Sequence, residues 1–131
     1  MIKRVITFGT FDVFHIGHVN ILERARRQGD YLIVGVSSDQ LNFDKKQRYP
    51  VYPQEQRVRI LQSLRFVDEV FIEDSLALKA QYIQQHRADV LVMGDDWAGK
   101  FNEMQQHCEV IYLPRTPSIS TSEIIEVVKA L

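Results

Sequence analysis

Two histidines, His15 and His18, stand three residues apart in a segment that also contains Gly9 and Gly17. At a helix entrance, side chains at this spacing lie on the same side, so both imidazoles can point at one ligand. Glycines let the backbone approach that ligand closely, and the first turn of a helix offers unpaired N–H groups to a phosphate. Imidazoles can also donate hydrogen bonds to the oxygens of a phosphoryl group as negative charge builds on it. The segment therefore predicts a phosphate site.

Two other interpretations of the histidines stay open at this stage. One histidine could cap the helix while the other packs in the core. The pair could also bind zinc, but no third histidine or thiol lies at ligand spacing, and Cys108 is the only cysteine. The same cysteine count excludes an internal disulfide. Asp12, inside the segment, could orient a ligand or fix the turn.

A second polar segment, Arg115 to Ser122, follows an apolar run near the end of the chain. Ser120 to Glu123 has the form of a capping box, which begins a helix. The same arrangement would turn hydroxyls, backbone N–H groups and Arg115 toward a phosphate. Two helix-entry anion sites suit a triphosphate better than a single phosphate. Upstream, Asp95, Asp96 and Trp97 could bind a ribose and base, or the two carboxylates could simply cap a turn.

The elements that position these residues follow from the apolar pattern. Short, nearly continuous apolar runs occupy 5–8, 31–36, 67–72, 90–93 and 110–113, and stretches with helical spacing lie between them. This alternation predicts an α/β, Rossmann-like doubly wound sheet of about five parallel strands with helices on both faces. Ligands bind at the carboxyl ends of such strands, which is where the polar segments stand.

The 131 residues predict one domain, 1–131, and the net charge of −1 argues against a nucleic-acid polymer or an anionic membrane as partner. No signal peptide or membrane-spanning stretch is visible, so a cytoplasmic location is expected. The one irregular region is 39–53, which we expect to be a mobile loop over the site. Its basic residues Lys45, Lys46 and Arg48, and Arg57 behind it, could equally form a solvated surface.

Gly-Thr-Phe-Asp at 9–12 and His-Ile-Gly-His at 15–18 resemble the signature of the nucleotidyltransferase superfamily that contains the cytidylyltransferases. Gly-Asp-Asp-Trp at 94–97, together with the segment from Arg115 to Thr121, is similar to the cytidylyltransferases that act on glycerol 3-phosphate. The similarity covers essentially the whole chain. Adenylyltransferase relatives usually carry a lysine or arginine where this chain has Glu123, which favours CTP over ATP.

This resemblance implies transfer of a cytidylyl group from CTP to a small polyol phosphate, with Mg²⁺ bound mainly through the triphosphate. It implies His15, His18, Lys45 and Arg115 as catalytic residues, and Lys45 and Lys79 at the acceptor, although Lys79 could be an exposed helical lysine. A homodimer and a role for CDP-glycerol in teichoic-acid-like or capsular polymers are also implied. The residues expected to bind CTP are Gly9, Thr10, Phe11, His15, Ile16, Gly17, His18, Lys46, Asp95, Trp97, Arg115, Thr116, Pro117, Ser118, Ile119, Ser120, Thr121 and Ser122.

The chain departs from the family pattern at two positions. Ser118 stands where glycine is usual, and Gln47 stands where a lysine is usual, so that Lys46 is a candidate replacement. Other functions also stay open. The acceptor could be phosphoethanolamine or another phosphorylated alcohol, the donor could be ATP, and a non-catalytic nucleotide-binding module could share both anion sites. A length of 131 residues without a lysine-rich second signature argues against an aminoacyl-tRNA synthetase.

Overall fold

The computed structural model describes residues 1–117 and 119–131. Five parallel strands form one sheet in the order β3-β2-β1-β4-β5. The chain starts in the middle of the sheet, builds one half, and returns to build the other, which confirms the predicted doubly wound fold. The strands are β1 (Arg4–Gly9), β2 (Tyr31–Ser37), β3 (Glu69–Glu73), β4 (Val90–Gly94) and β5 (Glu109–Leu113).

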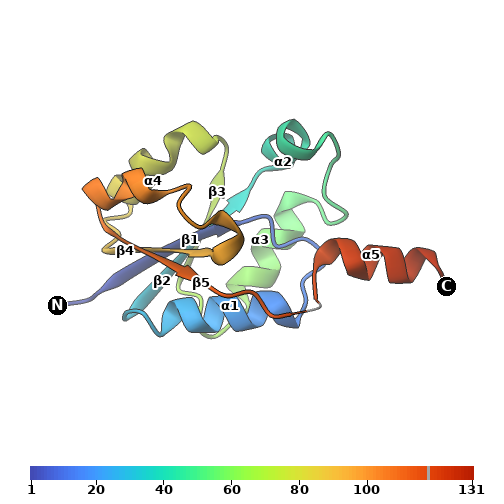
Figure 1. The fold of residues 1–131 in the computed structure, drawn as a ribbon, viewed down its shortest axis with the longest axis horizontal. Coiled ribbons are helices and arrows are strands. Elements are labelled where there is room, and N and C mark those ends of the chain that lie inside the picture. The colour runs from blue at the N-terminus through green and yellow to red at the C-terminus, as the bar shows by residue number, and fades with distance from the viewer. Residues whose placement is uncertain (118) are drawn as a thin grey trace.

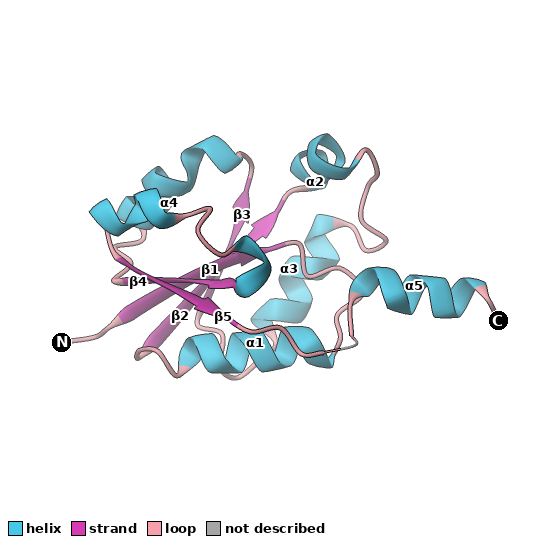
Figure 2. Ribbon diagram, viewed as in Figure 1, coloured by secondary structure: helices cyan, strands magenta, loops and turns pink. Residues whose placement is uncertain are grey.

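Helices cover both faces of the sheet, as predicted (Figures 1 and 2). Leu22 and Ala25 of α1 and Leu61 of α3 pack with one apolar cluster, whereas Ile83 of α4 packs with a second cluster on the other face. The α-helices are α1 (Ile16–Arg26), α2 (Asp39–Lys46), α3 (Gln54–Gln62), α4 (Lys79–Gln85) and α5 (Thr121–Lys129); 3-10 helices occupy η1 (Leu76–Leu78), η2 (Asp95–Trp97) and η3 (Asn102–Gln106).

The three central strands carry the core because both of their faces are covered. Val5, Ile6, Leu32, Ile33 and Leu91 are fully buried. Their near-continuous apolar runs are what a parallel strand buried on both faces requires. Phe8 and Met93, near the carboxyl ends of β1 and β4, are almost as buried. The carboxyl edge of the sheet is therefore well packed where the polar segments begin.

The prediction of a mobile loop over 39–53 is wrong for its first half. Residues Asp39–Lys46 form helix α2, because Ser38 caps it by accepting a hydrogen bond on Oγ from the N–H of Leu41 at 3.0 Å. The helix ends at Gln47, which has a left-handed backbone (φ 59°). The basic and proline-rich composition of the segment hid these local capping signals.

Helix α5 begins as predicted after Ser120, whose Oγ accepts a hydrogen bond from the N–H of Glu123 at 3.1 Å. None of its described residues is buried, and Figure 1 shows it extending away from the sheet toward the C-terminus. Among the described residues, no helix combines the length and apolar character needed to cross a membrane.

Candidate functional site

The polar residues that follow the strands enclose two adjoining cavities, of about 830 Å³ and 240 Å³. Both are lined by the end of β1 and by residues that follow β4, so they meet at the switch point of the sheet, where α/β proteins of this topology bind ligands. The residues lining both are Phe8, Gly9, Thr10, Phe11, His18, Met93, Asp96, Trp97 and Thr121.

The smaller cavity brings the two predicted anion sites together. His15 and His18 line it from the start of α1, and Arg115 and Ser120 line it from the segment before α5. These groups are about a hundred residues apart in the sequence. Their side chains and the first turns of two helices therefore face one space, which is a suitable size and polarity for phosphate groups.

The two histidines hold one another in place. His15 is the N-cap of α1, and its Nδ1 accepts a hydrogen bond from the N–H of Gly17 at 3.0 Å. The Nδ1 atom of His18 accepts from the N–H of His15 at 3.2 Å, and the two rings stack with centroids 3.8 Å apart. With Nδ1 engaged as an acceptor, each neutral ring carries its proton on Nε2. The capping interpretation and the ligand interpretation are thus compatible.

Burial keeps both imidazoles uncharged. It lowers the pKa of His15, and burial followed by the proximity of His15 lowers the pKa of His18 to about 3. Both rings are therefore neutral near pH 7 and offer Nε2–H as hydrogen-bond donors rather than as cations. Positive charge in the site comes instead from Arg115 and from lysines of the larger cavity.

The backbone around the histidines is tightly constrained. A Cβ atom on Gly17 would lie 2.8 Å from Cε1 of His15 and 3.1 Å from Cγ2 of Ile119, so only glycine fits between the two polar segments. Phe11 and Val13 have left-handed backbones, with φ of 54° and 48°. For a β-branched residue such as Val13 this is a costly conformation, and such strain is commonly found at binding sites.

Side-chain hydrogen bonds fix the segment before α5 against α1. Asn20 donates to Oγ1 of Thr116 at 2.9 Å, and Arg24 donates to the carbonyl of Pro114 at 2.8 Å. Thr121 donates from Oγ1 to the carbonyl of Asp12 at 2.8 Å. These contacts couple the position of one helix entrance to that of the other.

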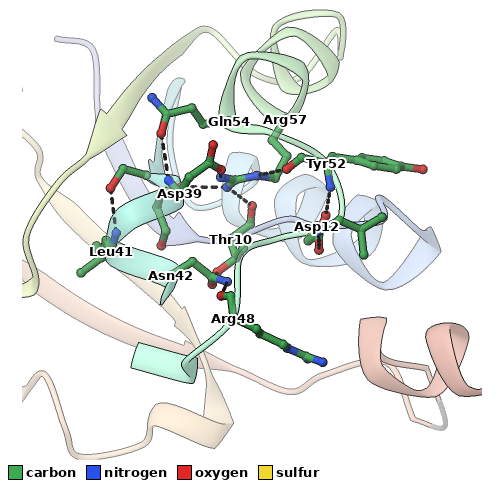
Figure 3. Close-up of polar contacts among 12 residues, drawn as sticks. Thr10, Asp12, Asp39, Leu41, Asn42, Arg48, Tyr52, Gln54 and Arg57 are labelled. Carbon is green, nitrogen blue, oxygen red and sulfur yellow. Dashed lines mark hydrogen bonds and ion pairs between the residues drawn. The ribbon is translucent and has the colours of Figure 1, made fainter. Parts of the chain in front are cut away.

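Asp12 fixes a loop rather than leaving its carboxylate free for a ligand. Its Oδ2 accepts from the N–H of Val51 at 2.7 Å and its Oδ1 from the N–H of Tyr52 at 2.8 Å (Figure 3). The 47–53 segment is thereby attached to the end of β1. Of the two roles left open for Asp12, the structure supports the fixing of the turn.

Arg57 is fully buried, so the solvated-surface interpretation is wrong for this residue. Its guanidinium donates to the carbonyls of Thr10, Ser37 and Tyr52 at 2.8–2.9 Å and pairs with Asp39 at 2.7 Å (Figure 3). One side chain thus connects the ends of β1 and β2 with α2. The sequence held a signal for this, since Arg57 lies four residues before Leu61 on the inner face of α3.

The larger cavity contains the basic residues. Lys45, Lys46 and Arg48 line it from α2 and the following turn, together with Lys79. Lys45 donates from Nζ to Oγ of Ser37 at 3.2 Å, and burial lowers its pKa.

Lys79 is not an exposed helical lysine. It is only 4% exposed and forms an ion pair with Glu73 at 2.6 Å. Burial lowers the pKa of Lys79, opposed by the carboxylate of Glu73. Sequence reasoning missed Glu73 and also Asn42, which accepts a hydrogen bond from Thr10 at 3.0 Å.

Some residues expected to bind CTP do not line either cavity. Ile16 is 56% exposed, and Asp95 and Pro117 are also exposed, whereas Asp96 lines both cavities. Ser118 lies outside the described residues. Within residues 1–117 and 119–131, no three histidine, cysteine or acidic side chains cluster as metal ligands would.

The sheet topology and the paired helix entrances define a doubly wound α/β protein with adjoining cavities at the switch point of its sheet. A family model described as cytidylyltransferase-like matches residues 6–127, and the chain belongs to this family of nucleotidyltransferases.

Similar proteins include a glycerol-3-phosphate cytidylyltransferase from Bacillus subtilis (strain 168), 50% identical over 98% of this chain and 99% of its own. A glycerol-3-phosphate cytidylyltransferase from Staphylococcus aureus (strain NCTC 8325 / PS 47) is 48% identical over 93% of this chain and 92% of its own. The solved structure of a lipopolysaccharide core biosynthesis protein from Thermoplasma volcanium GSS1 shares the fold, with a TM-score of 0.76 at 20% identity, over 88% of this chain and 99% of that one.

Proposed function

We propose that the chain, acting as one domain over 1–131, transfers the cytidylyl group of CTP to glycerol 3-phosphate and releases pyrophosphate. The observation that carries this proposal is that the His15–His18 pair and Arg115 line the same smaller cavity. This arrangement suits a triphosphate. The two relatives named above act on glycerol 3-phosphate by name, and they match this chain along almost its whole length.

The reaction needs no nucleophile from the protein, because a phosphate monoester is already largely ionised at neutral pH. An oxygen of the acceptor phosphate attacks the α-phosphorus of CTP in line and forms the new P–O bond. The bond from the α-phosphorus to its bridging oxygen breaks, and pyrophosphate leaves with that electron pair. The protein contributes position and charge stabilisation.

In this proposal His15 and His18 donate from Nε2 to the oxygens on which negative charge develops. Arg115 adds a fixed positive charge, and the N–H groups at the entrances of α1 and α5 complete the phosphate site. In the proposal Trp97, which lines both cavities, contacts the nucleoside, whereas Asp95 lines neither cavity and has no role in it.

The larger cavity would receive the acceptor. The cations that line this cavity outnumber its carboxylates: Lys45, Lys46, Arg48, Lys79 and Lys129 stand against Asp12, Glu73 and Asp96. This balance attracts a phosphate and repels a cationic alcohol, so it favours a polyol phosphate over phosphoethanolamine. Lys46 also lines the cavity, whereas Gln47 is the left-handed cap of α2 and donates to the carbonyl of Asp44. Lys46 is therefore our candidate for the phosphate contact that Gln47 does not make.

We include Mg²⁺ in the proposal as an ion carried by the nucleotide. Mg²⁺ is commonly bound by one or two carboxylates together with substrate phosphates, and Asp96 is the carboxylate best placed to contribute. The ion would neutralise negative charge on the triphosphate. A cytoplasmic homodimer, and use of CDP-glycerol in teichoic-acid-like or capsular polymers, also belong to this proposal. Light scattering after size exclusion would test the dimer.

A screen for pyrophosphate release tests the activity directly. CTP and ATP are each paired with glycerol 3-phosphate, phosphoethanolamine and another polyol phosphate. We expect release with CTP and glycerol 3-phosphate above all other pairs. A preference for ATP or for phosphoethanolamine would replace the proposed substrates. Calorimetric binding of CTP without product from any acceptor would identify a non-catalytic nucleotide-binding module.

A further inference from the structure

The buried ion pair between Glu73 and Lys79 forms part of the wall of the larger cavity. Glu73 ends β3 and lies beside Ser37 of β2, which is also fully buried. Lys79 begins α4, and its Nζ lies 3.8 Å from the ring centroid of Phe8. The pair is therefore enclosed by protein on one side and by the cavity on the other.

Stability alone does not account for this pair. Removing two charges from water costs several kcal/mol for each ion, and apolar residues of similar volume are often as stabilising as a buried ion pair. Glu73 is 1% exposed and Lys79 is 4% exposed, so both bear this cost. Charged groups kept in the wall of a ligand cavity at such a cost indicate a role in binding.

The carboxylate of Glu73 has one oxygen engaged and one available. Oε2 accepts from Nζ of Lys79 at 2.6 Å, whereas Oε1 has no hydrogen-bond partner among the described residues. Every fully buried side-chain oxygen or nitrogen of the described residues does have a partner. Since Glu73 lines the larger cavity, Oε1 is the atom of this pair that a ligand can reach.

We propose that Glu73 is the specificity-determining residue for the hydroxyl groups of the acceptor: Lys79 holds the carboxylate by Oε2, and Oε1 accepts a hydrogen bond from a hydroxyl of the polyol. This inference rests on the proposed function, because it concerns the acceptor of that reaction. An ionised carboxylate can only accept a hydrogen bond, so it favours a substrate that carries a hydroxyl donor. A substrate without a hydroxyl leaves Oε1 without a hydrogen bond. Neutralisation by Lys79 prevents the carboxylate from repelling the nearby phosphate.

The first test compares two acceptors with the unmodified protein and CTP. Glycerol 3-phosphate and propyl phosphate have the same carbon chain and the same attacking phosphate, and they differ in the two hydroxyls. We expect kcat/KM to be about 10- to 100-fold higher for glycerol 3-phosphate, the range for a hydrogen bond to a charged group. Equal values for the two acceptors would overturn the proposal without any variant.

The second test measures the same ratio in Glu73→Gln. An amide oxygen is a weaker acceptor, so the preference for glycerol 3-phosphate should fall by about 10-fold, chiefly through KM. A purely structural role for Glu73 would lower kcat/KM for both acceptors equally and leave the ratio unchanged, which would contradict the proposal. Asp74→Asn, an exposed change at the next residue, is the matched control and should keep the full preference.

If Glu73→Gln does not fold, the double variant Glu73→Gln/Lys79→Met replaces it, because it leaves no buried charge unpaired. The preference for the hydroxylated acceptor should be reduced there too. Absence of turnover in the unmodified protein with every acceptor would instead count against the proposed function. Titration calorimetry with the same two phosphates then still tests Glu73, since equal affinities in the unmodified protein would overturn its role.

Discussion

His18 accepts a hydrogen bond on Nδ1 from the backbone N–H of His15, and the two imidazoles stack 3.8 Å apart. The bond orients His18 through the residue that caps the helix, so neither ring can turn without disturbing the other. This arrangement leaves Nε2–H of both rings as donors. It also explains why the spacing of three residues and the intervening Gly17 belong together.

Removal of either imidazole should impair the reaction. We expect His15→Ala or His18→Ala to lower kcat by about 100-fold or more, the scale seen when one charge-stabilising donor is lost. The measurement is pyrophosphate release with CTP and glycerol 3-phosphate at saturation. His107→Ala removes an exposed histidine far along the chain and should leave kcat unchanged. Near-normal turnover in both site variants would remove the histidines from the proposed mechanism.

His18 should also make the fold sensitive to acid. Its pKa is lowered to about 3 in the folded protein, so the folded state binds fewer protons than the unfolded state below the ordinary histidine pKa of about 6.5. Stability from this group is complete above about pH 6.5 and is lost as the pH falls toward 3, at up to about 1.4 kcal/mol per pH unit. The free energy of unfolding, measured by urea titration, should fall less between pH 7 and pH 5 in His18→Gln than in the unmodified protein. An equal loss in both would contradict the assignment.

Arg57 should be essential for the fold around the site. Arg57→Met leaves the carbonyls of Thr10, Ser37 and Tyr52 without their donor and leaves Asp39 without its cation. We expect the free energy of unfolding to fall by about 3–5 kcal/mol, as for other broken buried pairs, measured by urea titration. Arg59→Met, an exposed change on the same helix, is the control and should cost less than about 0.5 kcal/mol. Similar losses of unfolding free energy in the two variants would show that the hydrogen bonds of Arg57 do not contribute specifically to stability.

The contact between Thr121 and Asp12 should matter more for catalysis than for stability. Thr121→Val removes the hydroxyl that donates to the carbonyl of Asp12 and keeps the shape of the side chain. A single hydrogen bond contributes about 1 kcal/mol, so the protein should stay folded. Because this bond aligns the two helix entrances, we expect a fall in kcat/KM for CTP of about 10-fold or more. Thr121→Ser, which retains the hydroxyl, should restore most of the activity, and failure to do so would point to the methyl group instead.

Much of the fold could be predicted because its signals are local. The apolar runs identified all five strands to within a few residues, and Ser120 with Glu123 identified the start of α5. The prediction failed at α2, where charge and prolines suggested a loop although Ser38 and Gln47 provide a cap at each end. Local composition and local capping competed there, and the hydrogen bonds of the cap decided the outcome.

The sequence by itself determined the strand and helix order, the two helix-entry segments and the chemistry that their histidines and hydroxyls can offer, since each depends on residues within one turn or strand. Only the tertiary structure decided that the segment of His15 and the segment of Arg115 line one cavity, because that depends on the order of strands in the sheet. It likewise decided that Arg57, Glu73 and Lys79 are buried. A charged side chain leaves water only when partners from other elements surround it, and those partners are distant in the sequence.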